Sequence, residues 1–155
     1  MLEPPVQQRN AAIGFRILHA TDQVWRVTNP LGVVNANLTH QLGFDDLTLR
    51  LWRLSPGQAM PRHRHQFQTE IYVLLEGGGR LRVDGTLLIL DPMSSVLVEP
   101  ESVRQVFNDT DTDALWLIAG VPPEAFPLTA DQHAAERDRL YPDGVEAMPS
   151  ELEST

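Results

Sequence analysis

Short apolar runs separated by turn-forming residues fill most of the chain. The clearest alternation lies at residues 46–54, where leucines at 47, 49 and 51 are interleaved with Thr48, Arg50 and Trp52. Side chains two positions apart share a face of a strand, so this segment predicts a strand with one apolar and one polar face. The run at 71–75 is nearly all apolar, which predicts a strand buried on both faces.

Turn sequences punctuate these runs at intervals of roughly ten residues. Asp84-Gly85 is a strong signal for a two-residue hairpin, and three glycines at 77–79 end the preceding run. Strands are therefore expected at 23–27, 33–38, 46–54, 71–75, 80–84, 86–90, 95–98, 103–107 and 114–121. Many short strands at this spacing favour an antiparallel sandwich or barrel, whose interior can hold a site.

The pattern changes after Pro122-Pro123. Residues 129–132 are similar to a capping box, which predicts a short helix at about residues 130–140. The segment 124–155 carries eight acids against two arginines, and we expect it to wrap the barrel and end in a disordered acidic tip. The chain is thus divided into an N-terminal arm (1–20), a barrel (21–123) and a C-terminal helix with an acidic tail (124–155).

Composition narrows the classes of partner and chemistry. The net charge of −9 argues against nucleic acid and anionic membrane surfaces, and no run of 18 apolar residues predicts a membrane span. The N-terminus has no basic region followed by an apolar one, so we expect no signal peptide and a cytoplasmic protein. Cysteine and lysine are absent, which excludes disulfides, thiolate ligands and lysine Schiff-base chemistry.

Three potential metal ligands lie close together in the chain. His63 and His65 are two residues apart and can reach one point from an extended segment, and Glu70 follows at the entry to the apolar run. Two imidazoles and a carboxylate form a ligand set for one divalent transition metal, such as Zn, Fe, Mn or Ni. Alternatively, the histidines are polar groups at a barrel mouth and Glu70 pairs with Arg62 or Arg64.

The spacing of Gly57, His63, His65, Glu70 and Gly77 matches the first motif of the cupin superfamily. On these residues the chain resembles that superfamily over roughly residues 45–120. The resemblance implies an all-β fold, a single antiparallel jelly-roll β-barrel (double-stranded β-helix), here with a short C-terminal helix. It also implies that the three ligands point inward near one mouth of the barrel.

The second cupin motif supplies a fourth ligand, a histidine, and it is degraded in this chain. Arg104 stands at the histidine position, while Asn108 matches the last residue of the motif. A guanidinium has no lone pair to give to a metal, so three protein ligands remain. A shift of one residue would offer Gln105 but would break the spacing to Asn108. Met93 and Glu101 stand at the two glycine positions.

Arg104 suggests a role in binding an anion. If its side chain enters the barrel near the metal, it is expected to hold the carboxylate or phosphate of a small molecule. The other possibility is that it turns outward and pairs with Glu99 or Glu101.

The reaction, and whether the protein is an enzyme, stay open. Cupin relatives include dioxygenases, isomerases and decarboxylases, so the resemblance is compatible with a metal-dependent enzyme acting on a small anionic substrate. It is also compatible with a non-catalytic small-molecule binder or sensor, or with a barrel that keeps a relic of a metal site. No catalytic residue is assigned. Tyr72 is a candidate proton donor, although core packing explains it as well.

A homodimer is the expected assembly. Antiparallel sheets keep edges and apolar faces that need cover, and Trp25, Trp52 and the N-terminal arm are candidates to provide it. The resemblance implies the same, because small cupins commonly pair.

Overall fold

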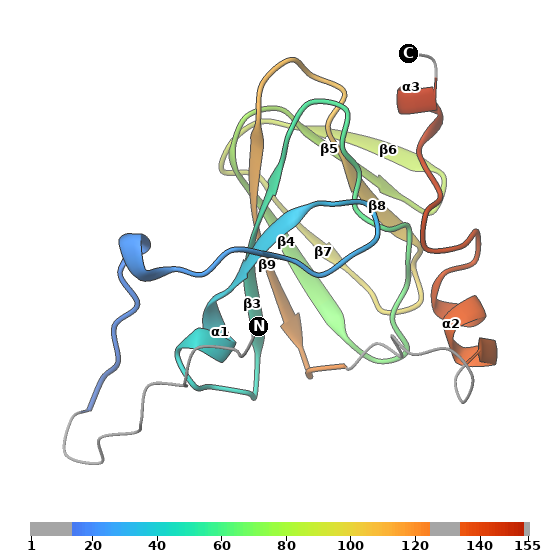
Figure 1. Cartoon of the computed structure of the whole chain (residues 1–155). Helices are drawn as coiled ribbons and strands as arrows, with labels where there is room; N and C mark the ends of the chain where they lie inside the picture. The colour runs from blue at the N-terminus through green and yellow to red at the C-terminus, as the bar shows by residue number, and fades with distance from the viewer. Residues whose placement is uncertain (1–13, 125–133, 154–155) are drawn as a thin grey trace.

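The computed structural model describes residues 14–124 and 134–153, whose nine strands form two antiparallel sheets around one core (Figure 1). The six-stranded sheet has the order β1-β2-β3-β9-β4-β7, and the three-stranded sheet has the order β6-β5-β8. The strands are β1 (Arg26–Val27), β2 (Val34–Asn37), β3 (Thr48–Leu54), β4 (Thr69–Glu76), β5 (Gly79–Val83), β6 (Thr86–Leu90), β7 (Ser95–Val98), β8 (Arg104–Phe107) and β9 (Ala114–Val121). The all-β prediction is confirmed, and each expected strand overlaps an observed one.

The described helical elements are short. They are the 3-10 helix η1 (Ala20–Asp22), α1 (Leu38–Gln41), α2 (Ala134–Leu140) and α3 (Ser150–Glu153). None of them is long and apolar enough to cross a membrane. α1 was not expected from the sequence. Its N-cap is Asn37, whose side chain accepts a hydrogen bond from the backbone N–H of His40.

The core lies between the two sheets. Leu54, Leu74 and Trp116 come from the six-stranded sheet, and they pack with Leu81 and Val106 from the three-stranded sheet. Each of these side chains is at most 1% exposed. Full burial of such a side chain contributes about 1.5–3 kcal/mol, so this cluster holds the two sheets together at one end of the barrel.

Strand β3 turns its polar face inward. Thr48, Arg50 and Trp52 line a cavity in the barrel, whereas the leucines between them point to the outer side of the six-stranded sheet. The sequence predicts the two faces of this strand correctly, but it does not say which one is interior. Trp52 therefore does not cover an outer face, as proposed from the sequence; it lies inside.

The sequence predicts that residues 71–75 are buried on both faces of the strand, and in the single chain this prediction is wrong. Glu70, Tyr72 and Leu74 point into the barrel and are buried, but Ile71 points outward and is 43% exposed. Ile71 pairs across the sheet with Leu97, which is 56% exposed. The outer side of this sheet therefore carries exposed apolar side chains at these two positions.

Positive backbone φ angles mark the turns of both motifs. Gly57 and Gly77 have φ of +83° and +82°, a conformation that only glycine adopts without steric cost. A Cβ atom on Gly77 would also lie 2.2 Å from the carbonyl oxygen of Asp113. Met93 has φ of 73°, so the degraded second motif keeps the backbone of the missing glycine.

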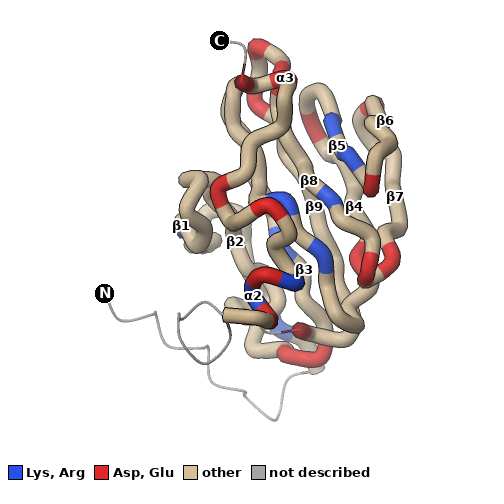
Figure 2. The backbone as a smooth tube through the Cα atoms, turned by 90° about the vertical axis from the view of Figure 1, so that its right-hand side faces the viewer, with Lys and Arg blue, Asp and Glu red and all other residues tan. Residues whose placement is uncertain are grey.

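The C-terminal segment lies along the barrel (Figures 1 and 2). The carbonyl of Leu140 accepts a hydrogen bond from the backbone N–H of Arg64, and that of Ala147 accepts one from the side chain of Gln105. α3 is anchored by an ion pair between Glu151 and Arg82. The predicted disorder of the acidic tip is therefore wrong for residues 150–153.

Some predictions fall partly outside the described residues. α2 begins at Ala134, whereas the helix was expected from about residue 130; residues 130–133 and the capping box at 129–132 lie in the undescribed part of the chain. The same holds for residues 1–13 of the N-terminal arm. The division of the chain into arm, barrel and tail stays a prediction.

Candidate metal centre

The two histidines lie on an extended segment between β3 and β4. His63 exchanges two backbone hydrogen bonds with Arg104, with N···O distances of 3.0 and 2.8 Å. The backbone N–H of His65 donates to the carbonyl of Pro100 at 2.8 Å. This pairing fixes the segment against the turn before β8, so both imidazoles enter the barrel. It also places Arg104 directly opposite His63, as the spacing of the second motif indicates.

The three predicted ligands converge. His63 Nε2 lies 3.6 Å from Glu70 Oε1, and His65 Nε2 lies 3.0 Å from the same oxygen. The candidate ligand atoms all lie within 4.8 Å of one another, and all three residues are buried. Metal bonds of about 2.0–2.2 Å to ligands in cis or tetrahedral positions place the ligand atoms about 3.0–3.5 Å apart. The distances between the ligand atoms thus fit a divalent ion with only small movements of the side chains.

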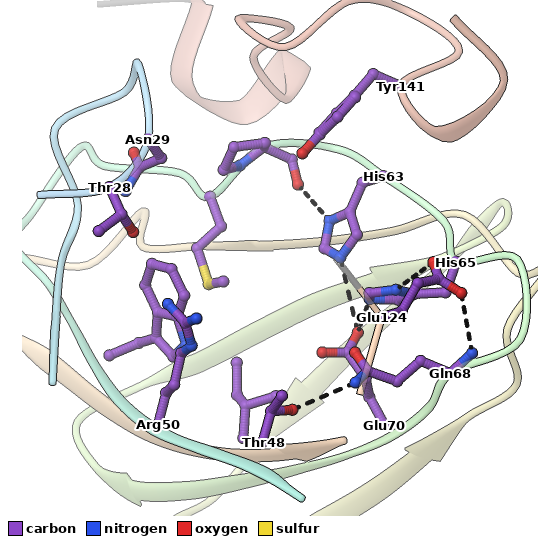
Figure 3. Close-up of a pocket in the computed structure, with 14 residues that line it drawn as sticks. Thr28, Asn29, Thr48, Arg50, His63, His65, Gln68, Glu70, Glu124 and Tyr141 are labelled. Carbon is purple, nitrogen blue, oxygen red and sulfur yellow. Dashed lines mark hydrogen bonds and ion pairs between the residues drawn. The ribbon is translucent and has the colours of Figure 1, made fainter. Parts of the chain in front are cut away.

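The other ring nitrogen of each histidine faces an acceptor. His63 Nδ1 lies 2.9 Å from the carbonyl oxygen of Pro61, and His65 Nδ1 lies 3.0 Å from Glu124 Oε2. Both acceptors favour a proton on Nδ1, which leaves the lone pair on Nε2 directed at Glu70 (Figure 3). A lone pair and a carboxylate oxygen at 3.0 Å need a cation between them. A proton or a metal ion can fill that position, so the donor set fits a metal.

Glu124 is a site residue that the sequence does not reveal. It follows β9, and the antiparallel pairing of β9 with β4 sets Val121 opposite Thr69, next to the histidine segment. Besides His65, it accepts backbone hydrogen bonds from residues 66–68 at 2.7–3.3 Å. Burial raises the pKa of Glu124, but the bonds from Gln66, Phe67 and His65 outweigh that effect and lower the pKa. The carboxylate therefore stays ionised and fixes the ring of His65.

Glu70 is held ionised in a buried place. Burial raises the pKa of Glu70. When a proton occupies the position between Nε2 and the carboxylate, hydrogen bonds and charge from His63 and His65 outweigh burial and lower the pKa of Glu70 well below the ordinary value. Tyr72 donates its hydroxyl to Glu70 Oε1 at 2.8 Å. Burial raises the pKa of Tyr72, and the charge of Glu70 raises it further. Tyr72 does not line the cavity, and its contact orients the Glu70 carboxylate.

Arg104 is buried beside Glu70. Its Nε lies 3.7 Å from Glu70 Oε1. Its terminal nitrogens donate to the main-chain carbonyls of Val98, Glu99 and Pro100 at 2.8–3.4 Å. The guanidinium thus binds carbonyl oxygens, not the carboxylate of Glu99 that was expected as one possible partner. Its role in binding a small molecule stays a prediction.

A cavity of about 340 Å³ opens beside the three ligands. The cavity is lined by polar side chains at the metal end and by Trp52, Met60 and Ile118 along its apolar part. Tyr141, just after α2, also lines it, with its ring centroid 6.3 Å from that of His63. Arg50 on β3 lines the side away from the histidines (Figure 3). Burial lowers the pKa of Arg50, and the charge of Glu70 partly offsets this, so the guanidinium stays protonated.

Solved structures share this architecture. A sugar phosphate isomerase of the cupin superfamily from Silicibacter pomeroyi is 23% identical, with a TM-score of 0.61 and coverage of 68% of this chain and 74% of that one. A protein described as a predicted oxalate decarboxylase, from Thermotoga maritima, is 16% identical, with a TM-score of 0.62 and coverage of 70% and 100%. A cupin 2 conserved barrel domain protein from Salinispora arenicola is 21% identical, with a TM-score of 0.56 and coverage of 70% and 87%.

A search of curated proteins finds no match. The family model described as the cupin domain matches residues 50–120, which span β3 to β9 and include His63, His65 and Glu70. The family match and the antiparallel barrel agree: the chain carries a cupin domain at residues 50–120.

Proposed function

We propose that this protein binds one divalent transition metal through His63, His65 and Glu70 and uses the site to bind or act on a small anionic molecule. The observation that carries the proposal is the pair of oriented imidazoles. Pro61 and Glu124 hold the Nδ1 atoms, so both Nε2 lone pairs meet at one oxygen of Glu70.

The ligand set supports an open metal site. Two imidazoles and one carboxylate leave positions for water or a ligand, as in catalytic zinc and non-haem iron sites. When bound, such a metal supplies Lewis-acid chemistry that polarises a carbonyl or activates water or dioxygen. The chain's own residues orient the ligands: Glu124 holds His65, and Tyr72 holds Glu70.

Charge near the cavity supports an anionic ligand. Arg50 and Arg104 balance Glu70 and Glu124, so a divalent metal would leave two excess positive charges in and beside the cavity. An anion would neutralise that excess. The solved structures described as a sugar phosphate isomerase and a predicted oxalate decarboxylase bear the names of enzymes with small anionic substrates, which agrees with the proposal.

Elemental analysis of the purified protein tests the metal proposal. We expect about one equivalent of a transition metal per chain and its loss when His63 and His65 are both replaced by Ala. The matched control replaces His19 and His40 by Ala, which removes two exposed histidines outside the site. Retention of the metal in the first variant would place it elsewhere, and a wild-type protein that binds no metal under any loading condition would favour a metal-free binder.

The contact of Glu70 with Arg104 supports that second candidate. Arg104 already supplies a positive charge at 3.7 Å from the Glu70 carboxylate, so the barrel can hold this buried acid without a metal. A small-molecule binding or sensing protein needs no more than the cavity and its charges. The same elemental analysis separates the two candidates.

The homodimer is also a proposal. The outer side of the six-stranded sheet carries a transverse row of apolar side chains from β3, β9, β4 and β7, formed by Leu49, Ala119, Ile71 and Leu97. A second copy of this face would cover it. Light scattering should give twice 17.4 kDa, and replacing Ile71 and Leu97 by Glu should halve that mass. Ile89→Glu, at a 66% exposed position on the other sheet, is the control.

A further inference from the structure

The inner face of β3 carries Arg50, an arginine that belongs to neither of the two cupin motifs. Arg50 is the cation among the described residues that line the cavity, and Figure 3 shows it across the cavity from His63 and His65. Other arginines of the described chain, such as Arg80 and Arg139, are satisfied by surface carboxylates. Within residues 14–124 and 134–153, Arg50 forms no ion pair with a carboxylate, although the charge of Glu70 acts on it through space.

To the described residues the Arg50 side chain makes one hydrogen bond, which holds it in place and leaves donors for a ligand. Arg50 Nη1 donates to Asn35 Oδ1 at 3.2 Å. The amide nitrogen of Asn35 donates to Thr28 Oγ1 at 2.8 Å, so the amide oxygen must face Arg50. Asn35 is 2% exposed and cannot turn freely. A guanidinium has five N–H donors in a fixed fork, and most of them remain available toward the cavity.

Thr28 adds a donor on the same side. Its hydroxyl oxygen accepts from Asn35, which leaves the hydroxyl proton free to donate. Thr28 lines the cavity, whereas the neighbouring Asn29 uses its side chain to hold the turn, accepting from Leu31 and Val33. The guanidinium and one hydroxyl therefore face the same space, at the end of the cavity that is remote from the metal ligands (Figure 3).

We propose that Arg50 and Thr28 form an oxyanion subsite that binds the carboxylate or phosphate group of a small molecule whose other end reaches His63, His65 and Glu70. The inference deepens the proposed function and rests on it for the metal end only. Trp52, Met60 and Ile118 also line the cavity and can contact the uncharged part of such a molecule. This subsite is distinct from the anion site expected at Arg104, because the terminal nitrogens of Arg104 already donate to main-chain carbonyls.

Titration of the full chain with inorganic phosphate and with acetate, by calorimetry, tests this subsite in metal-free and metal-loaded protein. We expect at least one of the two anions to bind the metal-free wild type. Arg50→Gln should weaken that binding tenfold or more, because a charged bidentate donor is lost. Arg50→Lys keeps the charge but not the fork and should recover only part of it. Thr28→Ala should weaken binding about threefold, and Thr28→Ser should restore it.

Arg53→Gln is the matched control, because Arg53 lies on the same strand, points outward and packs over the ring of Trp25. It should leave anion binding unchanged, and Arg50→Gln should leave the metal content unchanged. Anion binding that survives Arg50→Gln but disappears on metal removal would overturn the subsite and keep the metal proposal. Binding that depends on Arg50 in a protein that takes up no metal would overturn the metal proposal and keep the subsite. Absence of phosphate and acetate binding in both protein forms would overturn the subsite.

Discussion

Replacing Glu124 by Gln is the sharpest test of how the histidine segment is held. Glu124 Oε2 accepts from His65 Nδ1, while Oε1 accepts from the backbone of Phe67 and Gln68; both oxygens lie near the N–H of Gln66. Gln has the same shape but only one acceptor oxygen. It cannot satisfy the imidazole and the backbone donors together, so one of two defects must appear.

In the first case the amide oxygen faces the backbone and the NH₂ group faces His65. The imidazole must then accept at Nδ1 and carry its proton on Nε2, which blocks ligation. Loss of such an orienting partner lowers metal affinity about 10–100-fold, or about 1.4–2.7 kcal/mol. In the second case the amide oxygen stays on His65, and the backbone N–H groups of Phe67 and Gln68 lose their acceptor. The free energy of unfolding should then fall by about 1–3 kcal/mol.

Competition with a chromophoric chelator measures the affinity, urea unfolding of metal-free protein measures the stability, and ¹⁵N NMR of the imidazole reports the tautomer of His65. The control is Glu146→Gln, which removes an exposed acid from the same C-terminal segment. Unchanged affinity, stability and tautomer in Glu124→Gln would refute the reasoning. A loss of stability alone would show that Glu124 supports the loop but does not orient the ligand.

Three further changes have defined outcomes. Met93→Gly should stabilise the protein by about 0.5–1 kcal/mol in thermal unfolding, because relief of the positive φ exceeds the entropy cost of glycine; a loss would show that the side chain packs. The hydrogen bond from Arg82 lowers the pKa of Glu151 to about 2, so this pair stabilises the fold above about pH 4.5 and the stabilisation is lost as the pH falls toward 2. The difference in free energy of unfolding between wild type and Arg82→Gln should therefore shrink over that pH range. A difference that stays constant would contradict this prediction. Arg104→His should raise metal affinity at least tenfold, because an imidazole replaces a cation beside Glu70. It should also lower the free energy of unfolding by about 1–3 kcal/mol, because buried carbonyls lose their donor. Unchanged affinity in chelator competition would place Arg104 outside the site.

The ligand set could be predicted from sequence because its information is local. His63, His65 and Glu70 lie within eight residues, and the glycines at 57 and 77 fix the turns around them through their positive φ angles. The register of Arg104 opposite His63 follows from the spacing to Asn108, whose side chain bonds the carbonyls of Leu54 and Thr112. The ligands and the two glycines are set by turn chemistry and motif spacing, whereas the contacts of Arg104 with His63 and of Asn108 with Leu54 form only in the assembled barrel.

Glu124 and Arg50 could not be assigned in the same way. Glu124 reaches the histidines only because β9 pairs antiparallel with β4, so its role depends on contacts between residues more than fifty positions apart. The alternation in β3 separates Arg50 from the leucines but has the same period whichever face is inside. The apolar face of a strand is ordinarily taken as interior. Here the interior is polar because it contains the cavity, and the apolar face is left outside.

Glu70 Oε1 decides whether the metal site is needed for the fold. This one oxygen accepts from Tyr72 at 2.8 Å and lies 3.7 Å from the guanidinium of Arg104, so it has a donor and a counter-charge without a metal. A structural zinc site lacks such substitutes, and its apoprotein unfolds because buried ligands are left uncompensated. In this barrel several core side chains between the sheets, among them Leu54, Leu74 and Trp116, also do not line the cavity. Folding and metal binding are therefore separable, and a metal held by His63, His65 and Glu70 would serve the cavity chemistry rather than the stability of the barrel.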